Sequence, residues 1–355
     1  MLPRERVIAA LERKVDVLDR IPIHDSPWSA TIDRWRSEGL PSGISPADYF
    51  GYEIAVFGVD TSPQFPVEVL YEDDKYIVER TSFGGIRRNH RDYSTTPEII
   101  DWPCKCREDW EKIKPRLVPH ERRVDWISLI NSYHREKSRG RFLMYGAAVG
   151  FDKIQSYVRT DRLLKAIITD PEWVIDMYWT DAKLAMDMCD ILIKAGFKFD
   201  GAFLYCDLGY KNGLLFSPKH FEEQLHPVFK ELCRFFKSRG MYVFLHSCGC
   251  VKELVPYFIE EGFDVLQPLE VKAGMDLIEL KEKYGDKIAF MGGIDVRLMA
   301  LDDLKPLEKE VKTKITVAKE GGGYIYHSDH SVPKNVSLKN YKKVIELVLK
   351  YGRYK

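Results

Sequence analysis

The feature that most constrains the fold is a regular alternation of short apolar runs and longer helical patterns after residue 140. Each apolar run has the properties of a buried strand, and the segments between runs repeat apolar residues at helical spacing. The segment 171–196, for example, opens with proline and stops at glycine, as helices commonly do. Such alternation predicts parallel β-α-β units. The six strands predicted in this region are 141–150, 199–209, 241–249, 263–270, 287–295 and 321–330.

Two apolar runs before this region, 20–24 and 55–60, bring the predicted strands to the eight of a (β/α)8 TIM barrel. We therefore expect residues 1–355 to form a single barrel domain with an N-terminal β-meander insertion at about 62–135. Within it, residues 67–90 contain β-rich runs broken by the turn-like EDDK and FGG. An open doubly wound sheet is the rival, but no glycine-rich phosphate-binding turn follows a predicted strand.

The composition excludes several classes of protein. Lys plus Arg total 54 and Asp plus Glu total 54, so no basic surplus favours nucleic acid. No uninterrupted apolar run is long enough to span a membrane, and the charged N-terminal segment is unlike a secretory signal. Seven cysteines are sparse for 355 residues, which favours a cytoplasmic protein with reduced thiols. Cys104 and Cys106 are a weak metal motif, and we expect them in a solvent-facing loop.

Polar side chains follow nearly every predicted strand. A TIM barrel carries its active site at the C-terminal ends of its strands, so this pattern indicates an enzyme. The catalytic candidates are Asp207, Glu270, Asp295 and Asp329. Asp295 could equally cap the next helix, and Asp207 could bond backbone at its strand end. Further polar residues at strand ends are His24, Asp25, Asp60, Asp152 and His327.

The sequence FLHSCGCV at residues 244–251 points to a metal. His246 and Cys248 are two positions apart on a strand, so both side chains face the same side. Zinc binds nitrogen and sulfur, and a catalytic zinc takes three protein ligands and keeps one open position. His330 is the best candidate for the third ligand, with Glu270 and Asp329 behind it. A buried cysteine beside a core histidine is the alternative reading.

Three blocks of the sequence resemble the uroporphyrinogen decarboxylase superfamily: HSCG at 246–249, GGID at 292–295, and GGYIYHSDHSVP at 322–333. The resemblance extends over most of 1–15 and 140–350. It implies a (β/α)8 barrel and two activities, decarboxylation of uroporphyrinogen or cobamide-dependent methyl transfer. The arginine-rich segment with which the true decarboxylases hold substrate carboxylates has no counterpart here, where the chain reads PIHDSPWSATIDRW.

The chain resembles the methyltransferase branch more closely. That branch uses zinc, carries H-x-C on one strand, and places a cysteine after the last strand, where this chain has His330. The resemblance implies a zinc-assisted methyltransferase that works with a corrinoid (cobalamin) on a partner protein. Since a His-Cys-His set is less rich in thiolate, a methoxylated or other small methylated substrate fits better than a thiol, as in O-demethylation.

Two other functions stay open at this stage. One is a decarboxylase or lyase that acts on a small acid with the aspartates and His246 and needs no metal. The other is a ligand-binding barrel without catalysis. Bound metal and methyl transfer would separate the first hypothesis from both. The sequence also leaves open the substrate, the direction of methyl transfer and the oligomeric state, for which a homodimer is one option.

Overall fold

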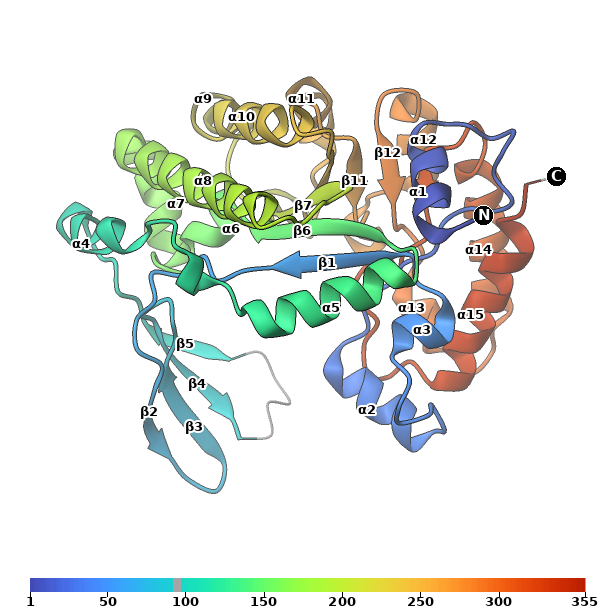
Figure 1. The fold of residues 1–355 in the computed structure, drawn as a ribbon, viewed down its shortest axis with the longest axis horizontal. Helices are drawn as coiled ribbons and strands as arrows, with labels where there is room; N and C mark the ends of the chain where they lie inside the picture. Colours follow the sequence, from blue (N-terminus) through green and yellow to red (C-terminus); the bar gives the residue numbers. More distant parts are fainter. Residues whose placement is uncertain (92–96, 355) are drawn as a thin grey trace.

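A computed structural model of the chain describes residues 1–91 and 97–354; residues 92–96, part of the predicted insertion, lie outside the described residues. Its centre is a curled parallel sheet of seven strands with helices around it (Figure 1). The strand order follows the chain, as in a TIM barrel. The strands are β1 (Ile54–Gly58), β6 (Phe142–Ala148), β7 (Gly201–Tyr205), β10 (Tyr242–His246), β11 (Val265–Gln267), β12 (Ala289–Met291) and β13 (Tyr324–Ile325).

The predicted strand 20–24 takes the eighth position of the barrel as a short extended segment. Ile23 forms an isolated parallel bridge with Tyr326, directly after β13. On its other side, the Ile23 carbonyl accepts a hydrogen bond from the Glu53 N–H, directly before β1 (2.9 Å). Pro22 has no N–H to donate, which limits the length of the pairing. The segment thus closes the gap between β13 and β1, and the α/β barrel expected from the sequence is confirmed.

Side chains alternate between the inside and the outside of the barrel, as the two-residue period of a strand requires. Phe203 and Phe244 belong to the apolar cluster inside the barrel, whereas Leu204 and Leu245 belong to the larger cluster between strands and helices. Val7 of α1 (Pro3–Leu11) is buried in the inner cluster. The interior is therefore packed with side chains, and α1 contributes to it.

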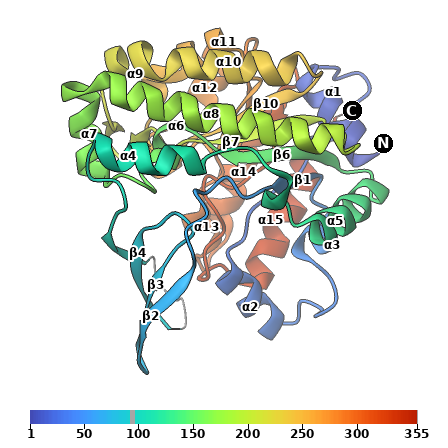
Figure 2. The ribbon, with the colours of Figure 1, turned by 60° about the vertical axis from the view of Figure 1, so that its left-hand side comes forward.

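Helices surround the sheet, and successive ones pack against each other (Figures 1 and 2). Pairs in contact include α8 with α10, α12 with α14, and α14 with α15. No helix in the described part of the chain is both long enough and apolar enough to cross a membrane. The remaining helices are α2 (Ser29–Ser37), α3 (Pro46–Phe50), α4 (Arg107–Ile113), α5 (Trp126–Ser138), α6 (Gly150–Ile154), α7 (Thr160–Thr169), α8 (Pro171–Lys194), α9 (Pro218–Gln224), α10 (His226–Lys237), α11 (Val255–Glu261), α12 (Leu277–Tyr284), α13 (Val296–Met299), α14 (Lys305–Ala318) and α15 (Leu338–Tyr351).

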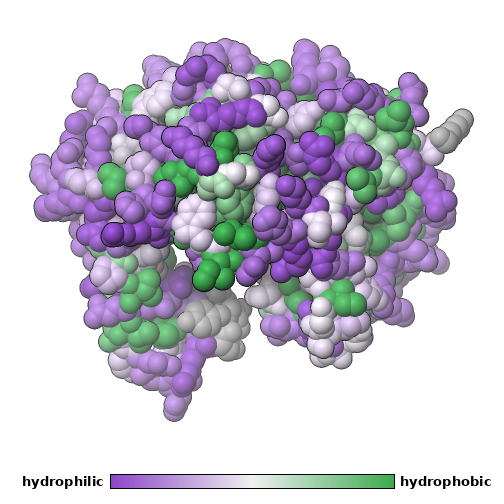
Figure 3. All heavy atoms as spheres, viewed as in Figure 1, coloured by the Kyte–Doolittle hydropathy of each residue, from purple (hydrophilic) through white to green (hydrophobic). Residues whose placement is uncertain are grey.

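A four-stranded antiparallel sheet lies between β1 and β6 in the chain and extends away from the barrel (Figures 1 and 2). We call it the meander sheet, and it is the β-meander that the sequence predicted. Its first strand is exposed along its whole length, and apolar side chains gather on this part of the surface (Figure 3). The meander sheet consists of β2 (Glu68–Glu72), β3 (Tyr76–Arg80), β4 (Ile86–His90) and β5 (Glu98–Asp101).

The loop after the meander sheet was expected to face the solvent, and one of its two cysteines does not. Cys106 is exposed, but Cys104 is fully buried. The Cys104 backbone N–H donates to the Tyr157 carbonyl (3.2 Å), which fixes this part of the loop against the barrel. The expectation of a solvent-facing loop was therefore wrong for Cys104, because a C-x-C pair with charged neighbours does not reveal which sulfur packs inward.

Glu53 joins the segment that closes the barrel to two arginines. Its carboxylate is buried, accepts the Ile23 N–H (2.7 Å), and pairs with Arg6 and Arg20. We expect Glu53→Gln to lower the free energy of unfolding by about 3–5 kcal/mol, because it leaves the buried Arg6 charge without one of its partners. Chemical denaturation measures this change. Glu68→Gln, which removes an exposed pair with Arg80, is the control and should cost about 1 kcal/mol or less. Equal losses in both variants would contradict this role of Glu53.

Candidate metal centre and active site

A cavity of about 560 Å³ lies at the C-terminal ends of the barrel strands, and we call it the first cavity. Its position is that of the active site in TIM-barrel enzymes. The walls combine aromatic, apolar and polar side chains that come from strands far apart in the sequence. The residues that line it are His24, Asp25, Ser26, Val56, Phe203, Tyr205, Asp207, His246, Cys248, Gln267, Pro268, His327, His330 and Ser331.

Three neighbouring strands end at the same level on one wall of this cavity. His246, the last residue of β10, is in register with Tyr205 of β7 on one side and with Gln267 of β11 on the other. Residues in register on parallel strands point to the same face, so all three side chains face the inside of the barrel. They lie above the apolar layer that contains Phe203 and Phe244. The strand pairing thus puts a polar layer directly on top of a packed apolar core.

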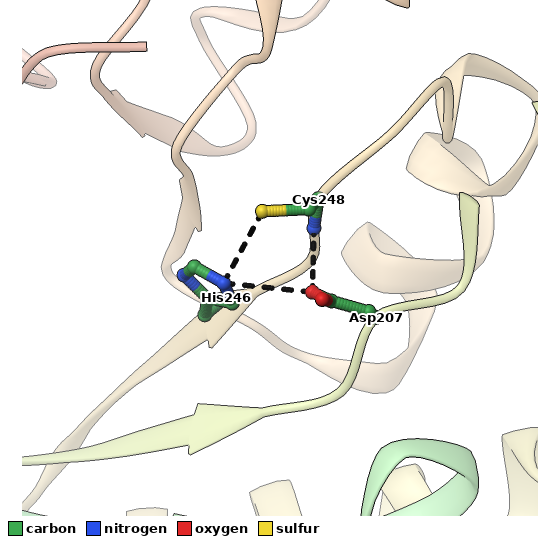
Figure 4. Close-up of side chains that lie close together, drawn as sticks. All are labelled: Asp207, His246 and Cys248. Atoms are coloured by element: carbon green, nitrogen blue, oxygen red, sulfur yellow. Dashed lines mark hydrogen bonds and ion pairs between the residues drawn. The ribbon is translucent and has the colours of Figure 1, made fainter. Parts of the chain in front are cut away.

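Asp207, His246 and Cys248 each point a possible ligand atom toward the same place (Figure 4). These atoms all lie within 4.8 Å of one another, and this is the one such group of three found in residues 1–91 and 97–354. The Cys248 sulfur is 3.4 Å from His246 Nε2, and an Asp207 oxygen is 3.5 Å from the same nitrogen. One oxygen, one nitrogen and one sulfur donor can together hold a divalent metal such as zinc.

The hydrogen bond between His246 and Gln267 determines which ring nitrogen is available. His246 Nδ1 lies 2.5 Å from the side-chain oxygen of Gln267, which can only accept. Nδ1 therefore carries the proton, and Nε2 keeps its lone pair on the side of Asp207 and Cys248. A histidine that binds a metal usually donates its other N–H to such a partner, which fixes the tautomer and the ring orientation. His246 is therefore oriented to bind a metal ion through Nε2.

Close contact between two loops brings Asp207 to Cys248. Gly249 has a positive φ of 82°, and a Cβ there would come within 2.2 Å of the backbone of Gly209. Only glycine permits this approach. As a result, the Cys248 backbone N–H donates to an Asp207 oxygen (2.8 Å). The small residues of H-S-C-G therefore help to assemble the group, and Cys250, which follows the turn, is not part of it.

The charges around Cys248 favour a cation. Burial raises the pKa of its thiol, and the carboxylates of Asp207 and Glu270 raise it further. Without a cation the thiol therefore stays protonated at neutral pH. A bound metal ion reverses this preference, since coordination to a divalent cation favours the thiolate. The group is thus suited to binding a metal through the sulfur, and unsuited to a free thiolate nucleophile.

Three more histidines line the first cavity. His330, the third ligand expected from the sequence, lies on this cavity but is not in the group with Asp207. His24 is half-buried, and its buried Nδ1 atom has no hydrogen-bond partner among the described residues. Burial lowers the pKa of His24 to about 3, and burial also lowers that of His327, so both rings stay neutral at physiological pH. They offer hydrogen bonds to a ligand without adding charge.

The other predicted catalytic carboxylates are buried and bind backbone N–H groups. Glu270 accepts from Gly249 (2.7 Å), next to the candidate ligand Cys248. Asp329 accepts from Val271 (3.0 Å) and Val296 (2.9 Å), and burial raises its pKa to about 6. Asp295 caps α13 and pairs with Arg297 (2.7 Å), as the alternative reading of the sequence anticipated. The structure therefore gives these carboxylates a role in holding the loops around the group.

The remaining residues from the strand ends lie apart from the group. Asp25 lines the first cavity but is occupied by hydrogen bonds from the Tyr341 and Ser328 hydroxyls (2.8 and 2.6 Å). Asp60 accepts from the Ser62 N–H (2.8 Å) in the loop after β1. Asp152 lies in α6 and lines a different cavity. None of these carboxylates has a ligand atom in the group of three.

Gln267 and Tyr205 belong to the wall of the first cavity, but the sequence analysis did not single them out. Gln267 was read as part of the apolar strand 263–270. It is the one polar residue in the run VLQ of β11, and this could have marked it. Tyr205 lies within the predicted strand 199–209 and belongs to none of the quoted motifs. Their proximity to His246 follows from register, which the sequence does not specify.

Comparison with known proteins agrees with this architecture. Residues 89–351 match the family model for uroporphyrinogen decarboxylase (URO-D). Among solved structures, a methyltransferase from Methanosarcina mazei aligns over 99% of both chains with a TM-score of 0.67 at 15% identity, which supports the fold. A chitinase from Chromobacterium violaceum covers 62% of this chain and 83% of its own with 10% identity, but its TM-score of 0.33 is too low to support an argument.

None of the curated proteins compared with this chain matches it significantly. The family model nevertheless covers well over half of the sequence, including β6 to β13 and the segments that carry Asp207, His246 and Cys248. The barrel and the polar residues at its strand ends agree with that match. The chain belongs to the uroporphyrinogen decarboxylase family.

Proposed function

We propose that this chain is the substrate-binding component of a zinc-assisted, corrinoid-dependent methyltransferase. It moves a methyl group between a small methylated compound, methoxylated in the simplest case, and the cobalt of a corrinoid on a partner protein. The observation that carries the proposal is the group of Asp207, His246 and Cys248 at the mouth of a barrel of this family. The similarity in fold to a protein named as a methyltransferase supports it.

The donor set fits a catalytic zinc. Three protein ligands with a fourth position open to substrate are typical of such sites, and the group faces a cavity that can admit a substrate. His246 and Cys248 would hold the ion, with Asp207 or His330 as the third ligand. When bound, zinc supplies Lewis acidity that lowers the cost of negative charge on the substrate heteroatom that gives up the methyl group.

The residues of the chain position the reactants. Gln267 orients His246, and the contact of Gly249 with Gly209 sets the distance between Cys248 and Asp207. Glu270 holds the Gly249 N–H, so the loop that carries Cys248 is fixed at both ends of its turn. Methyl transfer is an in-line displacement, and its rate depends on such alignment. If His330 is the third ligand, Asp207 is free to act as an acid toward the leaving heteroatom.

The first cavity disfavours the decarboxylation for which the family is named. Among the described residues that line it, none is Lys or Arg. A substrate with many carboxylates needs cationic partners, and guanidinium groups are the usual ones. The neutral rings of His24 and His327 suit an uncharged reacting group instead. This favours a small methylated compound at the first cavity over a tetrapyrrole.

Metal analysis tests the ligand set. We expect about one zinc per chain in protein purified without chelators, and we expect His246→Ala and Cys248→Ala to lose it because each removes a ligand. Cys250→Ala is the matched control, since it changes a neighbouring cysteine outside the group. Asp207→Ala and His330→Ala then identify the third ligand. A folded His246→Ala or Cys248→Ala variant with unchanged zinc would refute the proposed centre.

Turnover tests the reaction. The zinc-loaded protein should convert reduced cobalamin to methylcobalamin in the presence of a methoxylated compound, which absorbance follows directly. Cys248→Ser should reduce the rate by about 100-fold or more, since it removes the thiolate ligand of the metal. Cys250→Ser should retain the rate. Release of carbon dioxide from a small acid, with no methylcobalamin from any donor, would point to the lyase alternative.

Gln267 offers a test of positioning. We expect Gln267→Leu to lower zinc affinity or the rate of methyl transfer by about 10- to 100-fold, because His246 loses the acceptor that fixes its tautomer. Competition with a zinc chelator measures the affinity. Gln64→Leu, which removes only an amide bound to Asp60, should leave the affinity unchanged. A Gln267→Leu protein with normal zinc affinity and normal rate would show that His246 does not depend on this contact.

A further inference from the structure

A second cavity, of about 600 Å³, lies between the meander sheet and the barrel. Phe83 and Trp102 contribute aromatic walls from the segment between β1 and β6, and the barrel contributes the end of β6 and the helix α6 with the residues after it. The two cavities adjoin one strand pair, because Ala148 lines the second cavity and its register partner Tyr205 lines the first. A ligand in the second cavity is therefore close to the strands that carry the candidate metal centre.

Lys153 is the unusual residue of the second cavity. It is 2% exposed, and among the described residues the Thr61 hydroxyl (2.6 Å) is the one hydrogen-bond acceptor of its ammonium, which lies 4.7 Å from the centre of the Phe83 ring. Within the part of the chain that the structure describes, no carboxylate oxygen comes within the 4.0 Å of an ion pair. Burial lowers the pKa of Lys153, and a buried lysine normally has an ion-pair partner, so its position calls for an explanation.

The other cations of the second cavity already have partners. Arg80 pairs with Glu68 (2.9 Å), and Arg87 pairs with Glu79 (2.6 Å). Both pairs belong to the meander sheet and are complete without a ligand. Lys153 is different, because it lines the cavity and its ammonium has two N–H donors beyond the one that Thr61 accepts.

The carboxylate of Asp181 on α8 compensates the charge only in part. It is buried, and neither of its oxygens accepts a hydrogen bond of ordinary geometry from the described residues. Burial raises its pKa to about 7, and the nearby Lys153 opposes this rise. At neutral pH it is therefore only partly ionised. Asp152, on the side of the metal centre, is bound by the Gln155 amide, and burial and Asp207 raise its pKa. Neither carboxylate provides Lys153 with a full counter-charge.

We infer that the second cavity binds the carboxylate of an organic acid through Lys153, with the apolar body of the acid against Phe83 and Trp102. The acid is the methylated substrate itself, so this inference rests on the proposed function and names its substrate class. An anion at Lys153 supplies the missing counter-charge, and the aromatic walls suit an aromatic or otherwise apolar body. The reacting methyl group then lies toward the first cavity, whose lining has neutral imidazoles.

Calorimetry with the full chain tests the carboxylate site without any need for turnover. The probes are 4-methoxybenzoate and the uncharged 4-methoxybenzyl alcohol. We expect the acid to bind at least about tenfold more tightly than the alcohol, and Lys153→Met to abolish this difference while leaving the alcohol unaffected. Lys183→Met, an exposed lysine paired with Asp187 on α8, is the control and should bind both as the wild type does. Equal affinities in the wild type would overturn the inference, even if Lys153→Met fails to fold.

Two further measurements separate the inference from the proposed function. If the acid binds through Lys153 but no methyl transfer occurs, the carboxylate site stands and the methyltransferase proposal fails. If methyl transfer proceeds with equal KM values on acid and alcohol, and Lys153→Met changes neither, the function stands and the inference fails. Benzoate and phosphate test whether Lys153 belongs to an anion site separate from the substrate site. If either anion binds at Lys153 and the KM for the methylated acid does not rise, the methylated acid is not the ligand of Lys153.

Discussion

The parallel register of β7, β10 and β11 is the constraint on which the candidate site depends. It places Tyr205, His246 and Gln267 side by side at the end of the barrel, above an apolar layer that keeps the strands packed. His246 receives a fixed tautomer from Gln267 only because the two residues are opposite each other. A slip of one residue in either pairing would turn one side chain toward the helices and separate the two.

The carboxylates at the strand ends divide into two kinds with different consequences. Asp207 faces His246 and Cys248 in the first cavity, whereas Glu270, Asp295 and Asp329 bind backbone N–H groups of the loops behind them. Loops at a barrel mouth have many backbone donors outside regular pairing, and buried donors must find acceptors. Many acidic residues at strand ends therefore indicate that the loops at the barrel mouth are held by hydrogen bonds to carboxylates. Only some of these carboxylates can take part in chemistry.

The two cavities differ in the charge of their lining residues, so each suits a different chemical group. The first has one oxygen, one nitrogen and one sulfur donor together with neutral imidazoles, which suits a metal ion and an uncharged reacting group. The second has a buried ammonium beside aromatic rings, which suits an anionic group on an apolar body. Both cavities adjoin β6 and β7, through the register partners Ala148 and Tyr205. The meander sheet forms one wall of the second cavity, so the carboxylate site that we infer gives it a part in substrate recognition.

The sequence by itself determined the alternation of strands and helices, the strand ends at which polar residues collect, and the same-side placement of His246 and Cys248. These features depend on periodicity within single segments, which is visible in one chain. Tertiary structure alone decided that Asp207 joins His246 and Cys248, that Gln267 orients His246, and that Lys153 is buried with no ion-pair partner in residues 1–91 and 97–354. Each of these depends on contacts between segments far apart in the sequence, and such contacts are set by strand register and loop packing, which no local pattern encodes.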